Sequence, residues 1–488
     1  ECELVREAVK MICTISRGKF IQIFVSAIGC LTEFLAGVYT AWTSPTITLL
    51  MSEETPLESG PMSKEQVSLM TSMLYIGAIL GSFSAGWLVN GIGRKWSFIF
   101  SMASQLIANS LIILANTPIL LFISRIFSGF ITGATFVILP IFISEITQKN
   151  MRTTLGNFFG LSCNMGHLVG KALTNFGFYV VPSISLGCAI IFIGCFLMFP
   201  DTPEYLLLRN RGEDAAKSLK FYRGVQKDEP FPEVVASEFD EMKKVISLRN
   251  PNAKVTIRDF KAPTTILAII ITFVMTSNIN FTGIRLTTSF TATMLKDAGI
   301  DVDISLTDNI ICVLQVFGCI GTIYIIRWIK VRASFVIFYI LSIICFFGAG
   351  IQYFLHENGV DMIPYTWSFV SCIVFAVVFP SIAINNLSMN TSSQILPTKI
   401  RGSVLGTLNI LGLIVAFFTT QYYLYLVDTI GNSMVMCAMG CWCVIAVVFT
   451  YFFLPELHNQ SYSDIVNSLR SRLPGKFKVT PHPSVTTM

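Results

Sequence analysis

The chain has 488 residues, of which 53% are hydrophobic and 13% are charged, and its mean hydropathy is +0.66. Soluble globular proteins carry roughly 25% charged residues, so the composition excludes a soluble protein and places most of the chain in lipid. The net charge of +5 is modest and lies on loops and tails, so it reports membrane topology and not nucleic-acid binding.

Twelve segments are long and apolar enough to cross a membrane, which takes about 20 residues per helix. We expect the first to end early, at Thr43-Ser44-Pro45, and the seventh to be interrupted at Gly283, as happens where backbone lines a cavity. The twelve segments lie at 21–50, 67–89, 96–115, 119–143, 154–177, 184–200, 263–294, 304–326, 333–355, 364–392, 403–427 and 432–454.

The twelve spans divide into six and six around a hydrophilic stretch. PDTPEYLL begins at Pro200 and a similar PELHNQSYSDI begins at Pro455, each directly after an apolar span, which indicates two copies of one membrane module. The sequence therefore predicts an all-α membrane protein in four parts. These are a six-helix bundle at 1–200, a linker of amphipathic helices at 201–261, a second six-helix bundle at 262–455 and a tail at 456–488.

Charge in the short loops predicts the orientation, because Lys and Arg gather on the cytoplasmic side. The loops that alternate with the cationic ones are mainly acidic, with Glu53, Glu54 and Glu58 in the first of them. We expect a plasma-membrane protein whose termini and linker are cytoplasmic. The cationic loops contain Arg94, Lys95, Lys149, Arg152, Arg327, Lys330, Arg332, Lys399 and Arg401.

Several signatures of other protein classes are missing from the sequence. There is no GxxxxGK[ST] loop for a nucleotide and no water-accessible Ser/His/Asp or paired-carboxylate group, so we predict neither an enzyme nor a cofactor. Most of the 13 cysteines lie inside apolar spans without a CxxC pair, which favours packing residues over a metal site.

Charged residues recur at the cytoplasmic rim of both halves. A Gly-rich turn leads into Arg94, and Glu145 and Arg152 flank the next cytoplasmic loop. These charges are either solvated individually or form an ion-pair lock that closes the inner face. We favour a lock formed by Arg94, Glu145, Arg152, Glu204, Arg401 and Glu456. Gly129 and Gly133, four residues apart, should allow two helices to approach closely.

Together these motifs resemble the sugar-porter branch of the major facilitator superfamily. The matching pieces are GWLVNGIGRK, the Arg125–Arg152 pattern RIFSG…G…P…E…R, PDTPEYLL, LPTKIRG and PELHNQSYSDI, and they occur in the family's order. TAWTSP at Thr40–Pro45 is similar to the insect facilitated trehalose transporter subgroup. The resemblance implies the major facilitator fold, with twelve transmembrane helices in two six-helix bundles. It also implies facilitative transport of trehalose or a hexose by alternating access in a monomer.

The chain departs from the family pattern where the family binds sugar. A Gln of helix five is replaced by Gly160, the helix-seven QQLSGIN pattern reads Ile279 to Arg285, and helix ten lacks its prolines and Trp. Two Asn positions of helix eleven read Leu411 and Val415, and the carboxylate before LPTKIRG is Gln394.

Polar residues that remain in the spans are candidates for a rearranged substrate site. A sugar needs several donors and acceptors, since each buried hydroxyl left unpaired costs about 1–3 kcal/mol. The alternative is hydrogen bonding between helices, and for His167 a structural role. The predicted substrate-binding residues are Asn164, His167, Asn280, Thr282, Arg285, Asn386 and Glu33.

Two charges inside spans carry further predictions, because an ionisable residue in a membrane usually marks a pathway or a pair. Glu33 and Arg285 either pair across the bundle interface or extend to a nearer aqueous surface, and Arg285 could also meet an anionic solute. Proton-coupled relatives place an Asp on helix one, where this chain has Val38, so the resemblance implies a uniporter. Glu33 leaves proton coupling open.

Three other functions remain open from the sequence. The first is a carrier of another small polar or anionic solute, which Arg285 and the lost amides favour. The second is a nutrient sensor built on the carrier fold, although the tail after Glu456 is short for one. The third is an ion channel, which the paired six-helix layout disfavours. The expected partners are a small solute and the lipid bilayer.

Overall fold

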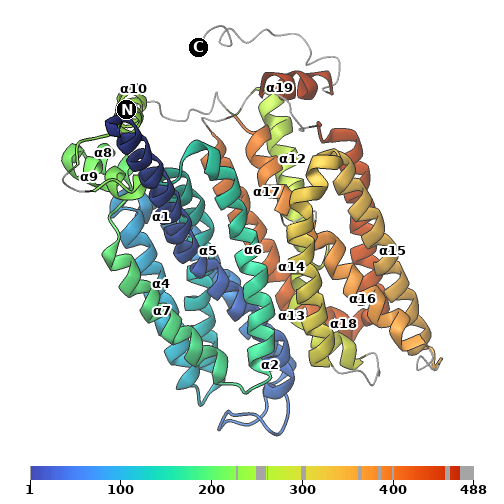
Figure 1. Ribbon diagram of the computed structural model, residues 1–488. Helices are drawn as coiled ribbons and strands as arrows, with labels where there is room; N and C mark the ends of the chain where they lie inside the picture. The colour runs from blue at the N-terminus through green and yellow to red at the C-terminus, as the bar shows by residue number, and fades with distance from the viewer. Residues whose placement is uncertain are drawn as a thin grey trace. The chain divides into compact units, whose positions relative to one another are not determined.

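Helices dominate the structure because a backbone in lipid must satisfy its own N–H and C=O groups. The computed structural model describes residues 2–226, 229–248, 260, 262–297, 304–360, 365–382, 386–397, 400–456 and 462–472, and these contain no strand. The chain divides into two compact units, Glu1–Ala253 and Lys254–Met488. Each unit is described by itself (Figure 1). The domain boundaries drawn from the sequence stay a prediction.

The first unit contains six spans followed by three short helices. The spans are formed by α1 and α2 together and by α3 to α7, and the short helices are α8 to α10. The helices are α1 (Cys2–Ala41), α2 (Thr43–Leu50), α3 (Lys64–Gly91), α4 (Arg94–Ile113), α5 (Pro118–Ile146), α6 (Lys149–Thr174), α7 (Val180–Met198), α8 (Pro203–Leu208), α9 (Gly212–Arg223) and α10 (Glu233–Leu248).

The second unit repeats the six-span pattern with more interruptions. Gly283, at φ +75°, separates α12 from α13, and this confirms the predicted break in the seventh span. The helices are α12 (Pro263–Phe281), α13 (Ile284–Asp297), α14 (Ile304–Trp328), α15 (Val331–Glu357), α16 (Thr366–Pro380), α17 (Asn386–Ile395), α18 (Arg401–Phe453) and α19 (Tyr462–Ser471).

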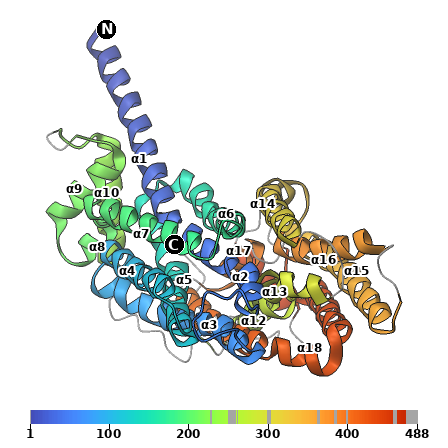
Figure 2. The ribbon, with the colours of Figure 1, turned by 90° about the horizontal axis from the view of Figure 1, so that it is seen from below.

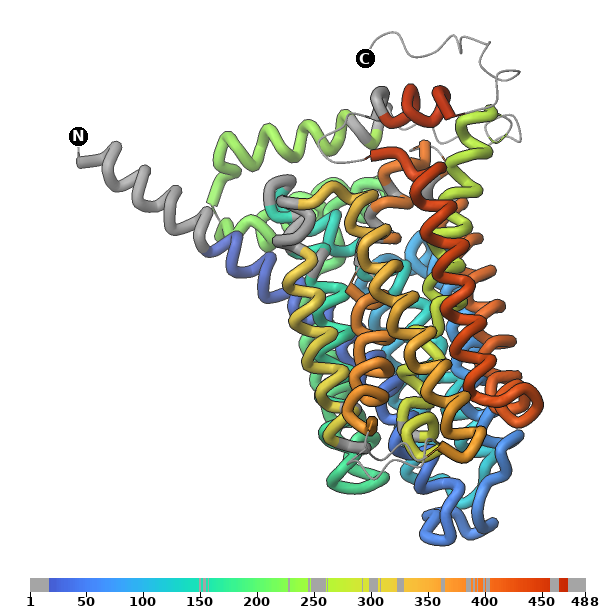
Figure 3. The backbone as a smooth tube through the Cα atoms, turned by 90° about the vertical axis from the view of Figure 1, so that its right-hand side faces the viewer, coloured from blue at the N-terminus to red at the C-terminus, as the bar shows by residue number. Residues whose placement is uncertain are grey.

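The predicted spans are all represented. In the described part of the chain, eight segments are long and apolar enough to cross a membrane. One of them, α18, contains two predicted spans joined at Gly431, where φ is +83° and the chain turns back (Figure 3). The helices α6, α14 and α16 complete the twelve. The predicted end of the first span at Thr43-Ser44-Pro45 is wrong, because these residues begin α2 and the span continues to Leu50. Trp42, between α1 and α2, keeps helical backbone angles, and Pro45 is tolerated because it lies in the first turn of α2.

Glycines bring helices of the first unit into close contact. A Cβ at Gly129 would overlap the carbonyl oxygen of Leu74, and a Cβ at Gly133 would overlap that of Ala78. This confirms the predicted close approach and puts α5 against α3 (Figure 2). A Cβ at Gly166 would likewise overlap the carbonyl oxygen of Phe34, so α6 lies directly on α1.

Aromatic side chains fill the core between α4, α5 and α7. Phe98 packs edge-on against Phe142 with ring centroids 5.2 Å apart, and Phe192 stacks on Phe196 at 4.4 Å. All four are buried. Phe98 lies about one turn after Arg94 on α4, and Phe142 lies about one turn before Glu145 on α5, so the apolar core holds these two charged residues in place.

Candidate functional site

A tight turn between α3 and α4 brings together a buried cluster of polar residues in the first unit. Gly93 has φ +95°, and a Cβ there would collide with the Asp201 carboxylate and the Tyr205 ring. Only glycine fits such a turn without strain. The chain after α7 can therefore approach the first residues of α4.

The lock cluster, which we define as Arg94, Glu145, Asp201 and Thr202, forms at this turn. Arg94 Nε and Nη2 donate to Glu145 Oε1 at 3.0 and 2.5 Å, and Thr202 Oγ1 donates to Glu145 Oε2 at 2.5 Å. Arg94 and Glu145 are each 5% exposed. Glu145 is thus held by a cation from α4 and a hydroxyl from the α7–α8 connection, which suits a buried carboxylate.

Asp201 binds backbone instead of a side-chain cation. Its Oδ1 accepts from the N–H groups of Arg94, Lys95 and Thr202 at 3.2, 3.3 and 2.8 Å. A carboxylate at the first residues of a helix satisfies free N–H groups and favours the helix dipole. Burial raises the pKa of Asp201, and the backbone donors act against that rise.

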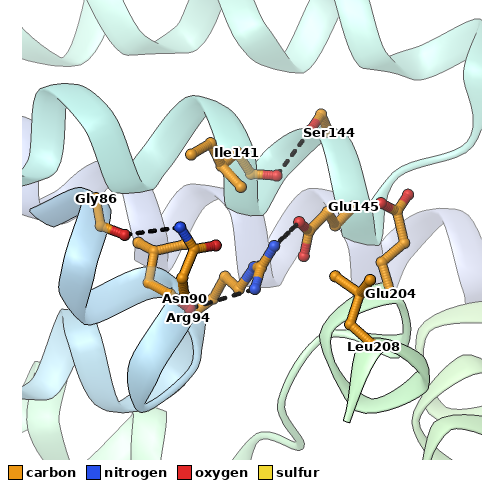
Figure 4. A pocket seen from close by; sticks show the side chains of 9 residues that line it. Gly86, Asn90, Arg94, Ile141, Ser144, Glu145, Glu204 and Leu208 are labelled. Atoms are coloured by element: carbon orange, nitrogen blue, oxygen red, sulfur yellow. Dashed lines mark hydrogen bonds and ion pairs between the residues drawn. The ribbon is translucent and has the colours of Figure 1, made fainter. Parts of the chain in front are cut away.

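A pocket of about 520 Å³ opens beside the lock cluster. Figure 4 shows Arg94 and Glu145 pointing toward each other, with Glu204 and Leu208 contributed by α8. The pocket lining combines one cation, two carboxylates and polar groups, so it suits a polar or cationic side chain better than an apolar one. Its lining residues are Gly86, Val89, Asn90, Arg94, Ile141, Ser144, Glu145, Glu204 and Leu208.

Helix α9 fastens the ends of two spans near the lock cluster. Ser218 Oγ donates to the Asp201 carbonyl at 2.5 Å, and Tyr222 Oη donates to the Pro200 carbonyl at 2.9 Å. Arg223 Nη1 donates to the carbonyl of Ile146, the last residue of α5, at 2.9 Å. The linker helix therefore ties the end of α7 to the end of α5.

The predicted substrate residues of the first unit lie on two helices in contact. Asn164 is buried and donates to the Gly160 carbonyl at 3.0 Å, while His167 is half-buried. Glu33 is 4% exposed, and its Oε1 has no hydrogen-bond partner among the described residues. Because Gly166 lies against Phe34, Glu33 and His167 each stand one residue from that contact.

In the second unit the predicted residues differ in how their polar atoms are used. Asn280 Nδ2 donates to the Gly412 carbonyl at 2.9 Å, and its buried Oδ1 has no hydrogen-bond partner in the described parts of the chain. Thr282 Oγ1 donates to the Asn278 carbonyl at 2.6 Å. Asn280 thus retains an acceptor for a ligand, whereas the Thr282 hydroxyl serves the helix break.

Asn278, on the same helix, uses both of its side-chain polar atoms in hydrogen bonds within the protein. Its Nδ2 donates to Tyr339 Oη at 2.7 Å, and Trp442 Nε1 donates to its Oδ1 at 3.0 Å. This amide joins α12, α15 and α18. Asn278 therefore shows the interhelical role that the sequence could not separate from substrate binding.

For four further predicted site residues, no side-chain contact is described. The side chains of Arg152, Asn386 and Arg401 lie outside the described residues. Arg285 is half-buried in the first turn of α13. Its proposed pair with Glu33 joins residues of different units, so the pairing stays a prediction.

Asp201 is a site residue that the sequence analysis missed, and Glu456, which it predicted, occupies the matching position of the second unit. Glu456 Oε1 accepts from the N–H of Val331, the first residue of α15, at 3.2 Å. Asp201 accepts from the first residues of α4 in the same manner, whereas the predicted Glu204 lines the pocket. Aligning Pro200-Asp201 with Pro455-Glu456 would have identified Asp201. Among the described residues, no group of His, Cys, Asp or Glu could hold a metal ion.

Comparisons with known proteins place these features in a family. Over 93% of this chain and 89% of its own length, the facilitated trehalose transporter Tret1 of Polypedilum vanderplanki is 24% identical. A Tret1-2 homolog of Drosophila sechellia is 23% identical over 93% and 92%.

Solved structures agree on the fold. The inward-open xylose transporter XylE from E. coli superposes with a TM-score of 0.74 at 18% identity, covering 91% of this chain and 99% of its own. A partially occluded inward-open structure of XylE gives 0.72 at 16% identity, covering 90% and 99%. The predicted major facilitator fold is confirmed. A model of the family described as sugar (and other) transporter matches residues 24–468, and the chain therefore belongs to that family of membrane transporters.

Proposed function

We propose that this protein is a facilitative carrier of a sugar, trehalose or a hexose, which moves its substrate down a gradient by alternating access. The observation that carries the proposal is the similarity to facilitated trehalose transporters along 93% of the chain, through both six-span units. Alternating access requires two such units.

Sugar recognition in the second unit would centre on Asn280. The Gly412 carbonyl fixes the orientation of its amide, so the buried Oδ1 is preorganised to accept a sugar hydroxyl. Arg285 and Asn386 would add donors to the same site. Asn164, His167 and Glu33 would supply the polar groups of the first unit, and the break at Gly283 would admit the solute to helix seven.

The charged rim would act as the cytoplasmic gate. Arg94 and Glu145 would order one wall, and Arg152, Glu204, Arg401 and Glu456 would complete the contacts that close the inner face. The positive loops support cytoplasmic termini in a plasma-membrane protein. We further propose that it works as a monomer, without nucleic acid or a coupled proton.

Uptake into oocytes tests the function. Radiolabelled trehalose and glucose should enter expressing oocytes with saturable kinetics, and internal unlabelled sugar should accelerate entry of the label. An imposed pH gradient should leave the rate unchanged. Entry without saturation would indicate a channel, and no entry of any sugar from a broad panel would reject the carrier proposal.

The Asn280→Leu variant tests the site. It should raise the KM for sugar roughly tenfold, because a sugar hydroxyl loses an acceptor worth about 1.5 kcal/mol. Asn358→Leu is the matched control, since Asn358 is exposed at the end of α15 and donates to its own helix. Equal KM values for the two variants would remove Asn280 from the site.

A further inference from the structure

Three arginines are buried among the side chains that the structure describes, and they differ in their counter-ions. Arg94 lies 2.5 Å from Glu145, and Arg223 lies 2.6 Å from Glu238. Arg125, on α5, is 1% exposed, the most buried of the three, and no carboxylate of the described residues pairs with it.

Aromatic rings surround Arg125 in place of a carboxylate. Its guanidinium carbon lies 4.8 Å from the centroid of the Trp42 ring and 5.2 Å from that of Tyr39. Nη1 donates to the Tyr39 carbonyl at 3.4 Å, and buried Nη2 has no hydrogen-bond partner among the described residues. One edge of the guanidinium is thus available to donate to a bound ligand.

The Trp42 ring is held in position by contacts within the first unit. Trp42 stands at the junction of α1 and α2, stacks on Tyr39 with centroids 5.8 Å apart, and donates from Nε1 to the Phe178 carbonyl at 3.2 Å. The ring faces attract a cation, but they leave its in-plane N–H groups unsatisfied.

Arg125 has cation–π contacts but no counter-ion among the described residues. A buried ion without a counter-ion costs more than cation–π contacts return, and a guanidinium does not escape the cost by losing its proton. We propose that Arg125 binds a small inorganic anion, a halide such as chloride, at the Nη2 edge between α1 and α5. A monatomic anion suits the site because one free donor edge cannot satisfy the several oxygens of phosphate or sulfate.

Trp42 reports on this site, because its buried ring touches the guanidinium. The test uses full-length protein in which Trp87, Trp96, Trp328, Trp367 and Trp442 are replaced by Phe. Iodide, added at constant ionic strength against gluconate, should quench the Trp42 fluorescence in a saturable manner, and chloride should compete. Bulk iodide contributes little, since Trp42 is 0% exposed.

Arg125→Met should abolish the saturable quenching. The double variant Arg223→Met/Glu238→Gln is the matched control, because it removes a buried arginine together with its own carboxylate, and it should keep the saturable quenching. Quenching that is strictly linear in iodide, or saturable quenching that survives Arg125→Met, overturns the proposal.

A second measurement keeps the proposal testable where Arg125→Met fails to fold. In the unmodified protein, replacing gluconate by chloride at constant ionic strength should raise the thermal unfolding midpoint by a few degrees and saturate. The double variant should show the same rise. An unfolding midpoint that is independent of chloride in the unmodified protein counts against the site. This outcome does not depend on sugar uptake, so it is separate from the proposed function.

Discussion

In both units, a carboxylate that follows the last span caps the first residues of the third span, but the two caps differ in how many described hydrogen bonds they accept. In the first unit, Asp201 follows the last span and accepts two backbone N–H groups at the start of α4 and a third from its neighbour Thr202. In the second, Glu456 follows the last span and accepts one N–H at the start of α15. The duplicated module therefore preserves a carboxylate after proline that caps its third span.

The units differ in what surrounds that cap. The first adds the buried Arg94–Glu145 pair and the Thr202 hydroxyl. At the position where the family resemblance expects a carboxylate in the second unit, this chain has Gln394, which is exposed. Backbone capping by a carboxylate thus occurs in both copies, whereas the buried ion pair is described in the first copy. Variants at each end can test this distinction.

Removing the cation of the first unit should have the largest effect. Arg94→Met leaves Glu145 buried without its counter-ion, which should cost about 3–5 kcal/mol and lower the thermal unfolding midpoint strongly. Differential scanning fluorimetry in lipid nanodiscs measures this. The double variant Arg94→Met/Glu145→Gln should recover most of the loss, and a double variant as unstable as the single one would contradict the ion-pair explanation.

Adding a side chain at Gly93, in the turn beside Asp201, should cause the next largest loss of stability. Gly93→Ala forces an L-residue to φ +95° and a methyl group against the carboxylate, which should cost about 1–2 kcal/mol for the backbone alone. Gly91→Ala is the matched control two residues away, because its Cβ would meet nothing within 4 Å. Similar unfolding midpoints for the two variants would show that Asp201 does not depend on the turn.

Removing the carboxylate cap of the second unit should lower the free energy of unfolding by less. Glu456→Ala removes one acceptor from the start of α15 and should cost about 1 kcal/mol. Asp201→Ala frees three N–H groups and should cost more. If Glu456→Ala is the more damaging change in the same unfolding assay, the ranking of the two ends is reversed.

The pH dependence of stability that Asp201 contributes is the smallest of the expected effects. Burial raises its folded-state pKa above the ordinary 3.8, so the folded protein holds this proton more tightly than the unfolded chain. The contribution of Asp201 to stability therefore falls as pH rises from about 3.8 through the raised pKa. Asp201→Asn keeps the acceptor but does not titrate. The midpoint of Asp201→Asn minus that of the unmodified protein should grow over this range and then level off, whereas a constant difference would contradict the shift.

Much of the fold could be predicted because lipid imposes a strong constraint on every span. Apolar length located all twelve spans, and Gly283 marked the interruption of the seventh. Gly129 and Gly133 predicted a close helix contact from spacing alone. Exact ends were harder, since Thr43-Ser44-Pro45 suggested an end of the first span, whereas Pro45 lies in the first turn of α2, where a helix tolerates proline, and the span continues to Leu50.

The site was less predictable because polar roles depend on partners that only the fold brings together. Asn278 and Asn280 are two residues apart and look alike in sequence, yet one joins three helices while the other keeps a free acceptor. Asp201 was overlooked in favour of Glu204 because backbone donors, which leave no trace in the sequence, decide which of two nearby carboxylates is bound.

The reversal at Gly431 constrains how the last two spans can move. No loop separates them: Glu357 accepts from the Ser433 hydroxyl at 2.6 Å, and a Cβ at Gly431 would lie 2.9 Å from Glu357 Oε1. Because the bend is short and bonded to Glu357 of α15, we expect the two arms of α18 to move together with α15 as one rigid body. An epitope tag inserted at Gly431 would separate the two arms of α18 and break their joint attachment to α15. The longer connection at 51–63 should accept the same tag without this effect.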